Sequence, residues 1–435
     1  MTQRRGKTRR LMALAAVGAL ASGVLAACGG EDDSGPPTLN WFINNPAQIP
    51  IGERCTEESG GAYQIRHDIM PNTAAGQREQ ILRRLAASDS SVDIISLDPP
   101  YIAELANADF LRPFTQEERD FFEEGMLDGP IAQSVYNGEM WAAPFFGNTQ
   151  LLWYKKSVAE AAGLDMTQPV TWDQLIEAAE ATDTTFAVQG RKNESLMVWV
   201  NAMVLSADGS ILTPESEGKI AADVRSGLDS DAGREAARIM RTIATSPIAP
   251  PAMSTAGEGE SVIEFKSENG GFMVNWPFVW ADFDASIEGG SIPPDFKDDV
   301  GWTRYPRVLP DVESATPLGG VSLAIGAFTD HPEEAVEAIK CLRGLESQKA
   351  YILAVGDPGA AEALYDDPDV REKFPMADDI RQGLTVAGPR PVTPFYGDVT
   401  GVIQQGYHPP DELTDSTAQN TAELLVAVLS NQRLL

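Results

Sequence analysis

The chain has 435 residues, more than one hydrophobic core usually supports, so two domains are expected. It carries 64 acidic and 33 basic residues, which gives a formal net charge of −31. That acidity excludes a nucleic-acid-binding protein, which needs a positive surface, and argues against docking of the protein body on anionic lipid.

The N-terminus has the order of a secretory signal peptide, with a basic start, an apolar run from Leu11 to Ala27 and small residues before Cys28. The alternative is an N-terminal membrane helix, but the run is at the short limit for a span of about 30 Å. The ending Leu25-Ala26-Ala27-Cys28 resembles the bacterial lipobox, in which the cysteine is lipidated. The sequence therefore predicts a signal peptide at 1–27, lipidation of Cys28 and a flexible polar tether at 28–37. Whether Arg9-Arg10 marks twin-arginine export or the general route stays open.

The next segments alternate between strand and helix patterns. Strands are predicted at 38–43, 63–69 and 92–97, and helices around Cys55, at 74–87 and from 101 to 106. This order predicts a mostly parallel sheet covered by helices. Ligands of such sheets bind beyond the carboxyl ends of the strands, and Asp98 stands at one of those ends.

The remaining elements follow from turn and capping signals. Asn137-Gly138 predicts a hairpin turn, and the long extended segment 141–154 is suited to cross between domains. Thr171 and Gln174 form a capping box for a helix to about residue 181. Further helices are predicted at 194–206, 231–245 and 331–345, the last capped by Asp330, and further strands at 271–276 and 321–325.

Two cysteines remain if Cys28 is acylated. An even number in an oxidising compartment favours a disulfide between Cys55 and Cys341. The alternative is a pair of buried free thiols.

Motifs for catalysis or cofactor binding are missing from the sequence. The three histidines, His67, His331 and His408, form no metal-type pair, and the sequence contains no Cys-x-x-Cys. It also contains no Gly-rich phosphate loop and no G-x-S-x-G elbow. We therefore expect no catalytic residue, no metal and no cofactor, although the abundant carboxylates leave a glycan-active envelope enzyme open as an alternative.

Several segments resemble one large family. Residues 110–114, 136–144, 148–156 and 169–175 resemble its most recognisable blocks, although Lys155 stands where asparagine is usual. The family is the extracellular sugar-binding proteins of ABC importers, of the maltose-binding-protein type. The resemblance implies a two-domain α/β fold of the periplasmic-binding-protein class (type II), with discontinuous domains, hinge strands and a ligand cleft between them. The domains would be residues 38–147 with 316–362, and residues 148–315 with 363–435.

The same resemblance implies where the protein acts and with what. It would be an exported monomer, lipid-anchored on the outer face of the cell membrane, that delivers a sugar to the transmembrane subunits of an ABC permease. The alternative ligand is a non-sugar solute, such as a peptide or an aminated compound.

Within the family, residues 148–154, 274–278, 319–320 and 390–394 resemble the trehalose-binding lipoproteins of mycobacteria, as do the surroundings of both cysteines. This implies trehalose as ligand and a set of ligand-binding residues. Asp98 and Asn148 would bind sugar hydroxyls, and Glu258 would accept a hydrogen bond. Trp276 would be the platform for a sugar ring. Gly320 would offer backbone groups, and Arg390 would donate a two-pronged contact. The loop after the first strand departs from the likeness, and Asn45 is the substitute candidate there.

Each assignment has a structural alternative. Asp98 could cap the following helix, Asn148 could be a structural linker residue, and Glu258 could lie in a solvated acidic loop. Trp276 could be core, Arg390 could pair with a surface acid, and Gly320 could serve a tight turn.

Overall fold

The computed structural model describes residues 35–216 and 221–435, of which residues 36–435 form one compact unit. The predicted signal peptide 1–27, the lipidation site Cys28 and the tether up to residue 34 lie outside the described residues. Within the described part of the chain, no helix is both long enough and apolar enough to cross a membrane.

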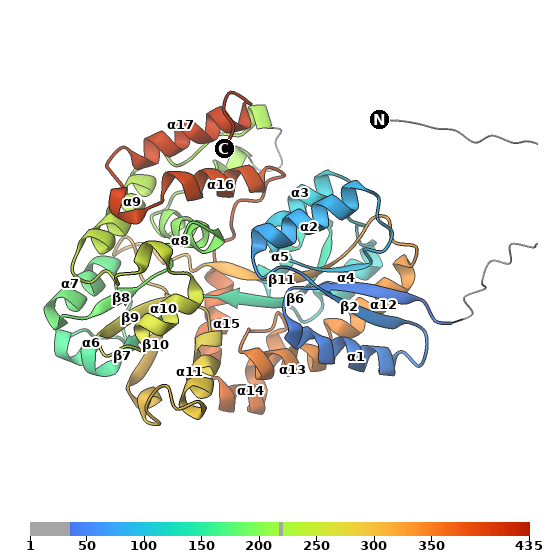
Figure 1. Cartoon of the computed structure of the whole chain (residues 1–435), viewed down its shortest axis with the longest axis horizontal. Coiled ribbons are helices and arrows are strands. Elements are labelled where there is room, and N and C mark those ends of the chain that lie inside the picture. The colour runs from blue at the N-terminus through green and yellow to red at the C-terminus, as the bar shows by residue number, and fades with distance from the viewer. Residues whose placement is uncertain (1–34, 217–220) are drawn as a thin grey trace, which may run out of the picture. The chain divides into compact units, whose positions relative to one another are not determined.

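A five-stranded sheet occupies one side of this unit, with the strand order β2-β1-β3-β11-β6 (Figure 1). Its strands are β1 (Thr38–Ile43), β2 (Gln64–Ile69), β3 (Ile94–Leu97), β6 (Ala142–Thr149) and β11 (Leu318–Ile325). A short hairpin of β4 (Val135–Tyr136) and β5 (Glu139–Met140) precedes β6. As predicted, Asn137 and Gly138 form its turn, both with positive φ.

Helices cover both faces of this sheet because its strands are apolar on both sides. Phe42 and Ile95 pack with α2 (Ala74–Ala86) and α3 (Ile102–Asn107), whereas Trp41 and Ile94 pack with α1 (Ile49–Glu58) and α12 (Pro332–Leu342). Other helices of the unit that contact these strands or their neighbours are α4 (Gln116–Glu123), α5 (Asp128–Gln133), α13 (Leu345–Val355), α14 (Pro368–Lys373) and α15 (Ala377–Val386). Near-continuous apolar strands of this kind are typical of sheets buried on two faces.

A four-stranded sheet, with the order β10-β7-β9-β8, forms the second layer system (Figure 1). Its strands are β7 (Leu151–Lys155), β8 (Thr185–Ala187), β9 (Gly270–Asn275) and β10 (Val300–Thr303). One face packs on α7 (Trp172–Thr182) and α8 (Glu194–Leu205), and the other on α10 (Glu258–Phe265) and α11 (Phe278–Glu288). The remaining helices are α6 (Lys156–Ala162), α9 (Asp231–Thr245), α16 (Tyr396–Gly406) and α17 (Thr417–Leu429).

The chain passes between the two sheets at more than one place. β6 belongs to the five-stranded sheet and β7 to the four-stranded one, so the predicted extended segment 141–154 does cross, with Gln150 between the two strands. A second passage leads from β10 to β11, and Pro317 at its end pairs in parallel with Gly388, which lies between α15 and α16. The crossing segments therefore lie side by side; the predicted domain boundaries themselves stay a prediction.

The prediction of a mostly parallel, helix-covered sheet is confirmed: β1 pairs in parallel with β2 and β3, and β11 is the strand that runs antiparallel to its neighbours β3 and β6. One prediction about a helix was wrong. The helix predicted at 331–345 begins at Pro332 after His331, which is its N-cap, so Asp330 does not cap it. It ends at Leu342, and Gly344 is the N-cap of the next helix, α13.

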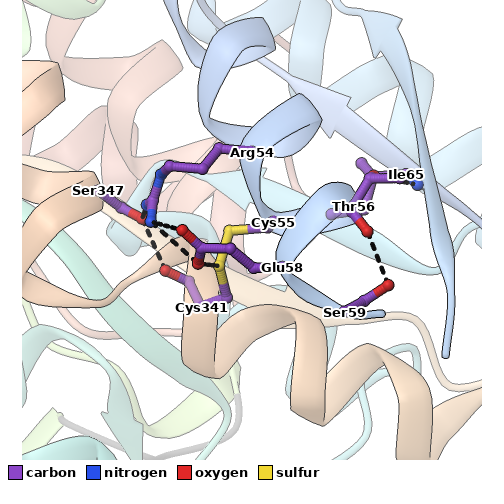
Figure 2. The surroundings of a disulfide bond; sticks show 8 residues. All are labelled: Arg54, Cys55, Thr56, Glu58, Ser59, Ile65, Cys341 and Ser347. Carbon is purple, nitrogen blue, oxygen red and sulfur yellow. Dashed lines mark hydrogen bonds and ion pairs between the residues drawn. A yellow bond between two sulfur atoms is a disulfide. The ribbon is translucent and has the colours of Figure 1, made fainter. Parts of the chain in front are cut away.

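The predicted disulfide between Cys55 and Cys341 is present and joins α1 to α12, 286 residues apart in the sequence (Figure 2). Arg54 lies beside it, hydrogen-bonded to Glu58 at 2.9 Å and to the hydroxyl of Ser347. That hydroxyl in turn donates to the carbonyl of Cys341 at 2.7 Å. The bond thus ties two helices that cover the same face of the five-stranded sheet.

Candidate functional site

Four strand ends of the five-stranded sheet meet at one place. β1 and β3 are parallel and end before Asn44 and Asp98, whereas Asn148 near the end of β6 pairs with Gly319 near the start of the antiparallel β11. The corresponding end of the four-stranded sheet carries Trp276 directly after β9. Since β6 continues into β7, the two sheet ends face the same crossing point. The sequence-predicted residues are therefore brought to one region of the fold.

Arg390 holds an acid from each side of this region. Its guanidinium donates to both oxygens of Asp98, at 2.6 Å and 3.3 Å, and to Glu194 Oε1 at 2.7 Å. Asp98 follows β3, whereas Glu194 is the first residue of α8 on the four-stranded sheet. The Arg390 side chain is 6% exposed, and it pairs with these acids instead of a surface one. Asp98 makes no side-chain cap to the helix that follows.

The surroundings of Glu194 fix its carboxylate. The hydroxyls of Tyr396 and Thr400, both from α16, donate to it, the second at 2.9 Å. Burial raises the pKa of Glu194, and the charge of Arg390 opposes that rise. Arg390 thus joins the two layer systems through partly buried, charge-assisted hydrogen bonds.

Glu258 and Trp276 form a second pair. The indole N–H of Trp276 donates to Glu258 Oε1 at 2.8 Å, and the Ser195 hydroxyl donates to the same oxygen at 3.5 Å. Glu258 is the first residue of α10 and not part of a loop. Asn275 positions both partners, because its amide donates to the Glu258 carbonyl at 3.0 Å and its oxygen accepts from the Trp276 backbone N–H at 2.8 Å. Burial raises the pKa of Glu258, and the indole hydrogen bond lowers it.

Asn148 meets a carboxylate that the sequence did not single out. Its amide nitrogen donates to Asp357 Oδ1 at 3.2 Å, and its own oxygen accepts from the Thr149 backbone at 3.0 Å. Asp357 follows Gly356 after α13. Burial, and then the charge of Glu258, raise the pKa of Asp357 to about 7.

Two glycines of β11 allow a close approach of other groups. Gly320 has φ +130°, and a Cβ there would lie 2.2 Å from the carbonyl oxygen of Phe146, so a side chain would be strained in conformation and in space. A Cβ on Gly319 would lie 3.0 Å from the Trp276 ring. The indole of the four-stranded sheet therefore lies against bare backbone of the five-stranded sheet. Asn45 uses its side-chain oxygen to accept from the Ala47 backbone at 2.9 Å, as the N-cap of a short helical turn.

Sequence reasoning missed Glu194, Asp357 and Tyr351. Glu194 opens a very apolar helix, and only the N-cap Asn193 marks that place. Asp357 lies in a Gly-Asp-Pro turn that has no pattern of its own, and Tyr351, whose hydroxyl lies beside Asp357, belongs to α13 before that turn. Each becomes recognisable only through partners far away in the sequence. In residues 35–216 and 221–435, no group of three His, Cys, Asp or Glu side chains is arranged to hold a metal ion.

Comparison with known proteins places the chain in a family. The family model of the bacterial extracellular solute-binding proteins matches residues 69–349 of the sequence, which is more than half of the chain. The chain belongs to this family. Solute-binding proteins bind a ligand without transforming it, so this protein is not an enzyme, and the alternative of a glycan-active enzyme is set aside.

Individual relatives match over shorter stretches. A Deinococcus radiodurans protein described as a probable ABC transporter-binding protein is 27% identical over 277 residues, which cover 60% of this chain and 61% of that protein. A Brucella abortus protein described as a putative binding protein is 20% identical over 205 residues, which cover 44% of this chain and 46% of that protein. The chain thus spans less than two thirds of the length of these curated relatives.

Solved structures match over nearly the whole length. Maltose-bound MalE3 of T. maritima has a TM-score of 0.76 and 24% identity, and the match covers 91% of this chain and all of that one. The GacH receptor of Streptomyces glaucescens, solved unliganded and with acarbose, has a TM-score of 0.71 and 17% identity, covering 91% and 99%. The fold is therefore the α/β periplasmic-binding-protein fold of the MalE type.

Proposed function

We propose that this protein is the solute-binding component of an ABC importer and that it captures a carbohydrate between its two sheets. The observation that carries the proposal is the convergence of an indole, an arginine and several carboxylates from both sheets on one crossing point. Trp276 reaches Gly319, and Arg390 joins Asp98 to Glu194. The maltose and acarbose of the structural relatives, and the transporter named for the D. radiodurans relative, agree with it.

The proposed ligand is a disaccharide, with trehalose as the candidate that the sequence resemblance suggests. A sugar ring offers an apolar face for an indole and hydroxyls for paired hydrogen bonds. Trp276 would provide the ring platform, and Asp98, Asn148, Glu258 and Arg390 would provide acceptors and donors. Gly320 and Asn45 would complete the set from the strand ends. An affinity of about 1 μM would correspond to roughly −8 kcal/mol.

Ligand binding would close the two domains about the crossing segments. Such hinge closure needs a change of conformation in only a few residues at the ends of strands, helices or loops. The ligand favours the closed form through contacts that it makes with both sides at once. The transmembrane subunits of the permease would then bind the closed monomer.

We also propose export and lipid anchoring through Cys28, on the outer face of the cell membrane. Replacing Cys28 by Ala is expected to move most of the protein from the membrane fraction to the medium or periplasm, because the acyl chains could no longer attach. Fractionation followed by immunoblotting measures this. A Cys28→Ala variant that stays with the membrane to the same extent as the wild type would overturn the anchoring proposal.

Calorimetric titration tests the proposed ligand. We expect one-site binding of trehalose, compared with maltose and sucrose, by the soluble chain from Gly29, which retains the whole compact unit Pro36–Leu435. Trp276→Ala should weaken it by at least about thirtyfold, roughly 2 kcal/mol, because the ring platform and the partner of Glu258 are both lost.

Trp302→Ala is the matched control, since Trp302 also donates its indole N–H to a carboxylate, Asp379 at 3.1 Å, but lies on β10 outside the site. Its trehalose affinity should equal that of the wild type. No heat with any of the three sugars from a folded protein would contradict the disaccharide assignment. A rise in melting temperature with peptides and not with sugars would then favour the non-sugar alternative.

A further inference from the structure

The candidate site holds more negative than positive charge. Four carboxylates line it: Asp98, Glu194, Glu258 and Asp357. Among the described residues, Arg390 is the basic side chain that forms ion pairs with them, and it pairs with the first two only. Glu258 and Asp357 instead accept hydrogen bonds from the neutral side chains of Trp276, Ser195 and Asn148.

A chain of contacts places Glu258 and Asp357 in one region. Glu258 accepts from the indole of Trp276, whose ring lies against Gly319. Gly319 pairs with Asn148, and the amide of Asn148 donates to Asp357. Burying a carboxylate without a counter-charge is costly, and the cost rises when a second carboxylate is near. Burial raises the pKa of both Glu258 and Asp357 accordingly. A bound cation would remove this cost more completely than any neutral ligand.

Two further groups in the same region can serve a ligand. Tyr351 is 1% exposed, and its hydroxyl lies beside Asn45 and Asp357, with free acceptor capacity on its oxygen. The Nε of Arg390 is buried without a partner within the described residues. Buried polar groups are nearly always satisfied, so a ligand oxygen is the natural partner for that Nε.

We propose that the carbohydrate bound here carries one protonated amine, as an amino sugar or an aminocyclitol does, and that Asp357 and Glu258 receive the ammonium. This inference rests on the proposed function of the site. An ammonium offers three donors, and the two carboxylates with the Tyr351 hydroxyl offer three acceptors. Arg390 carries one positive charge beside Asp98 and Glu194 and would repel a second cation placed there. The positions left for a cation are therefore at Glu258 and Asp357, which fits a single amine on a sugar better than a polyamine.

The test compares trehalose with its mono-amino analogues, in which one hydroxyl at a time is replaced by an amine, and with the N-acetyl forms of these amines. Calorimetry at pH 7 uses the protein purified from membranes in detergent with its natural N-terminus. At least one amino analogue should bind about tenfold or more tightly than trehalose, and acetylation, which removes the charge, should abolish the gain.

Asp357→Asn and Glu258→Gln keep the shape of the site and remove one charge each. Either change should reduce the ratio between the amine and trehalose affinities by at least about threefold. Glu362→Gln removes the same charge from an exposed position and should leave the ratio unchanged.

The outcomes separate this inference from the function on which it rests. Trehalose binding with no gain for any amino analogue would overturn the inference and keep the proposed function. An amine preference that survives both Asp357→Asn and Glu258→Gln would overturn it as well. If none of these compounds binds, both the inference and the proposed function are contradicted.

Discussion

Replacing Arg390 by Gln should lower the free energy of unfolding by about 3 kcal/mol at pH 8, because two largely buried carboxylates, 19% and 16% exposed, lose their counter-charge. The guanidinium of Arg390 donates to Asp98 Oδ1 at 2.6 Å and to Glu194 Oε1 at 2.7 Å, and it is the positive charge beside both acids. Since these acids come from different sheets, the variant should also bind trehalose at least about tenfold more weakly. Urea unfolding and calorimetric titration measure the two effects.

The deficit should depend on pH in a definite direction. Burial already raises the pKa of Glu194, and the charge of Arg390 opposes that rise. Without Arg390, the carboxyl of Glu194 should therefore stay protonated to a higher pH than in the wild type. A carboxyl whose pKa is raised on folding destabilises the protein progressively as pH rises from its unfolded to its folded value. The difference in unfolding free energy between the variant and the wild type should therefore be smallest near pH 4 and largest above neutral pH.

Arg238 provides a matched control, because it also bridges two acids. It donates to Asp173 at 2.9 Å and to Glu235 at 2.6 Å, but its side chain is 37% exposed, against 6% for Arg390. Exposed ion pairs contribute about 0–1 kcal/mol, so Arg238→Gln should cost no more than that. Equal losses in the two variants, or a deficit of Arg390→Gln that is the same at pH 5 and pH 8, would show that the buried network is not what Arg390 stabilises.

Local signals were sufficient for the elements and for some of the site. The helix at Trp172 begins at the Thr171–Gln174 capping box, and the hairpin turns at Asn137-Gly138, because both depend on residues a few positions apart. Asp98 could be singled out because a buried strand ends there. Family resemblance was the basis for naming Trp276, Glu258 and Arg390. The residues around them in the sequence form no local pattern that indicates a role.

Long-range pairing could not be predicted in the same way. The direction of β11 is decided by β3 and β6, which lie more than 150 residues earlier, and the apolar pattern of the strand is the same in either direction. Glu194 and Asp357 were missed for a similar reason. Their environment is made by Arg390, Tyr396 and Asn148, which the sequence places far from them. The end of α12 was missed although Gly344 is a recognisable boundary signal.

Removing the disulfide should have an effect on stability that rivals the loss of Arg390. The bond between Cys55 and Cys341 closes a loop of 286 residues, and restricting so long a loop in the unfolded chain contributes up to about 5 kcal/mol in the loop-entropy treatment. The double variant Cys55→Ser/Cys341→Ser should therefore lose about 2–5 kcal/mol of unfolding free energy, measured by urea unfolding without reductant.

Two controls separate loss of the crosslink from loss of packing. The wild type unfolded in strong reductant should behave like the double serine variant, because Arg54, Glu58 and Ser347 keep their contacts around α1 and α12 in both (Figure 2). The ligand affinity of the folded variant should stay within about twofold of the wild type, since the crosslink acts mainly on the unfolded chain. An unfolding midpoint that reductant does not change would mean that the helices, and not the bond between them, provide the stability. A loss of ligand affinity in proportion to the loss of stability would instead mean that the bond shapes the native site.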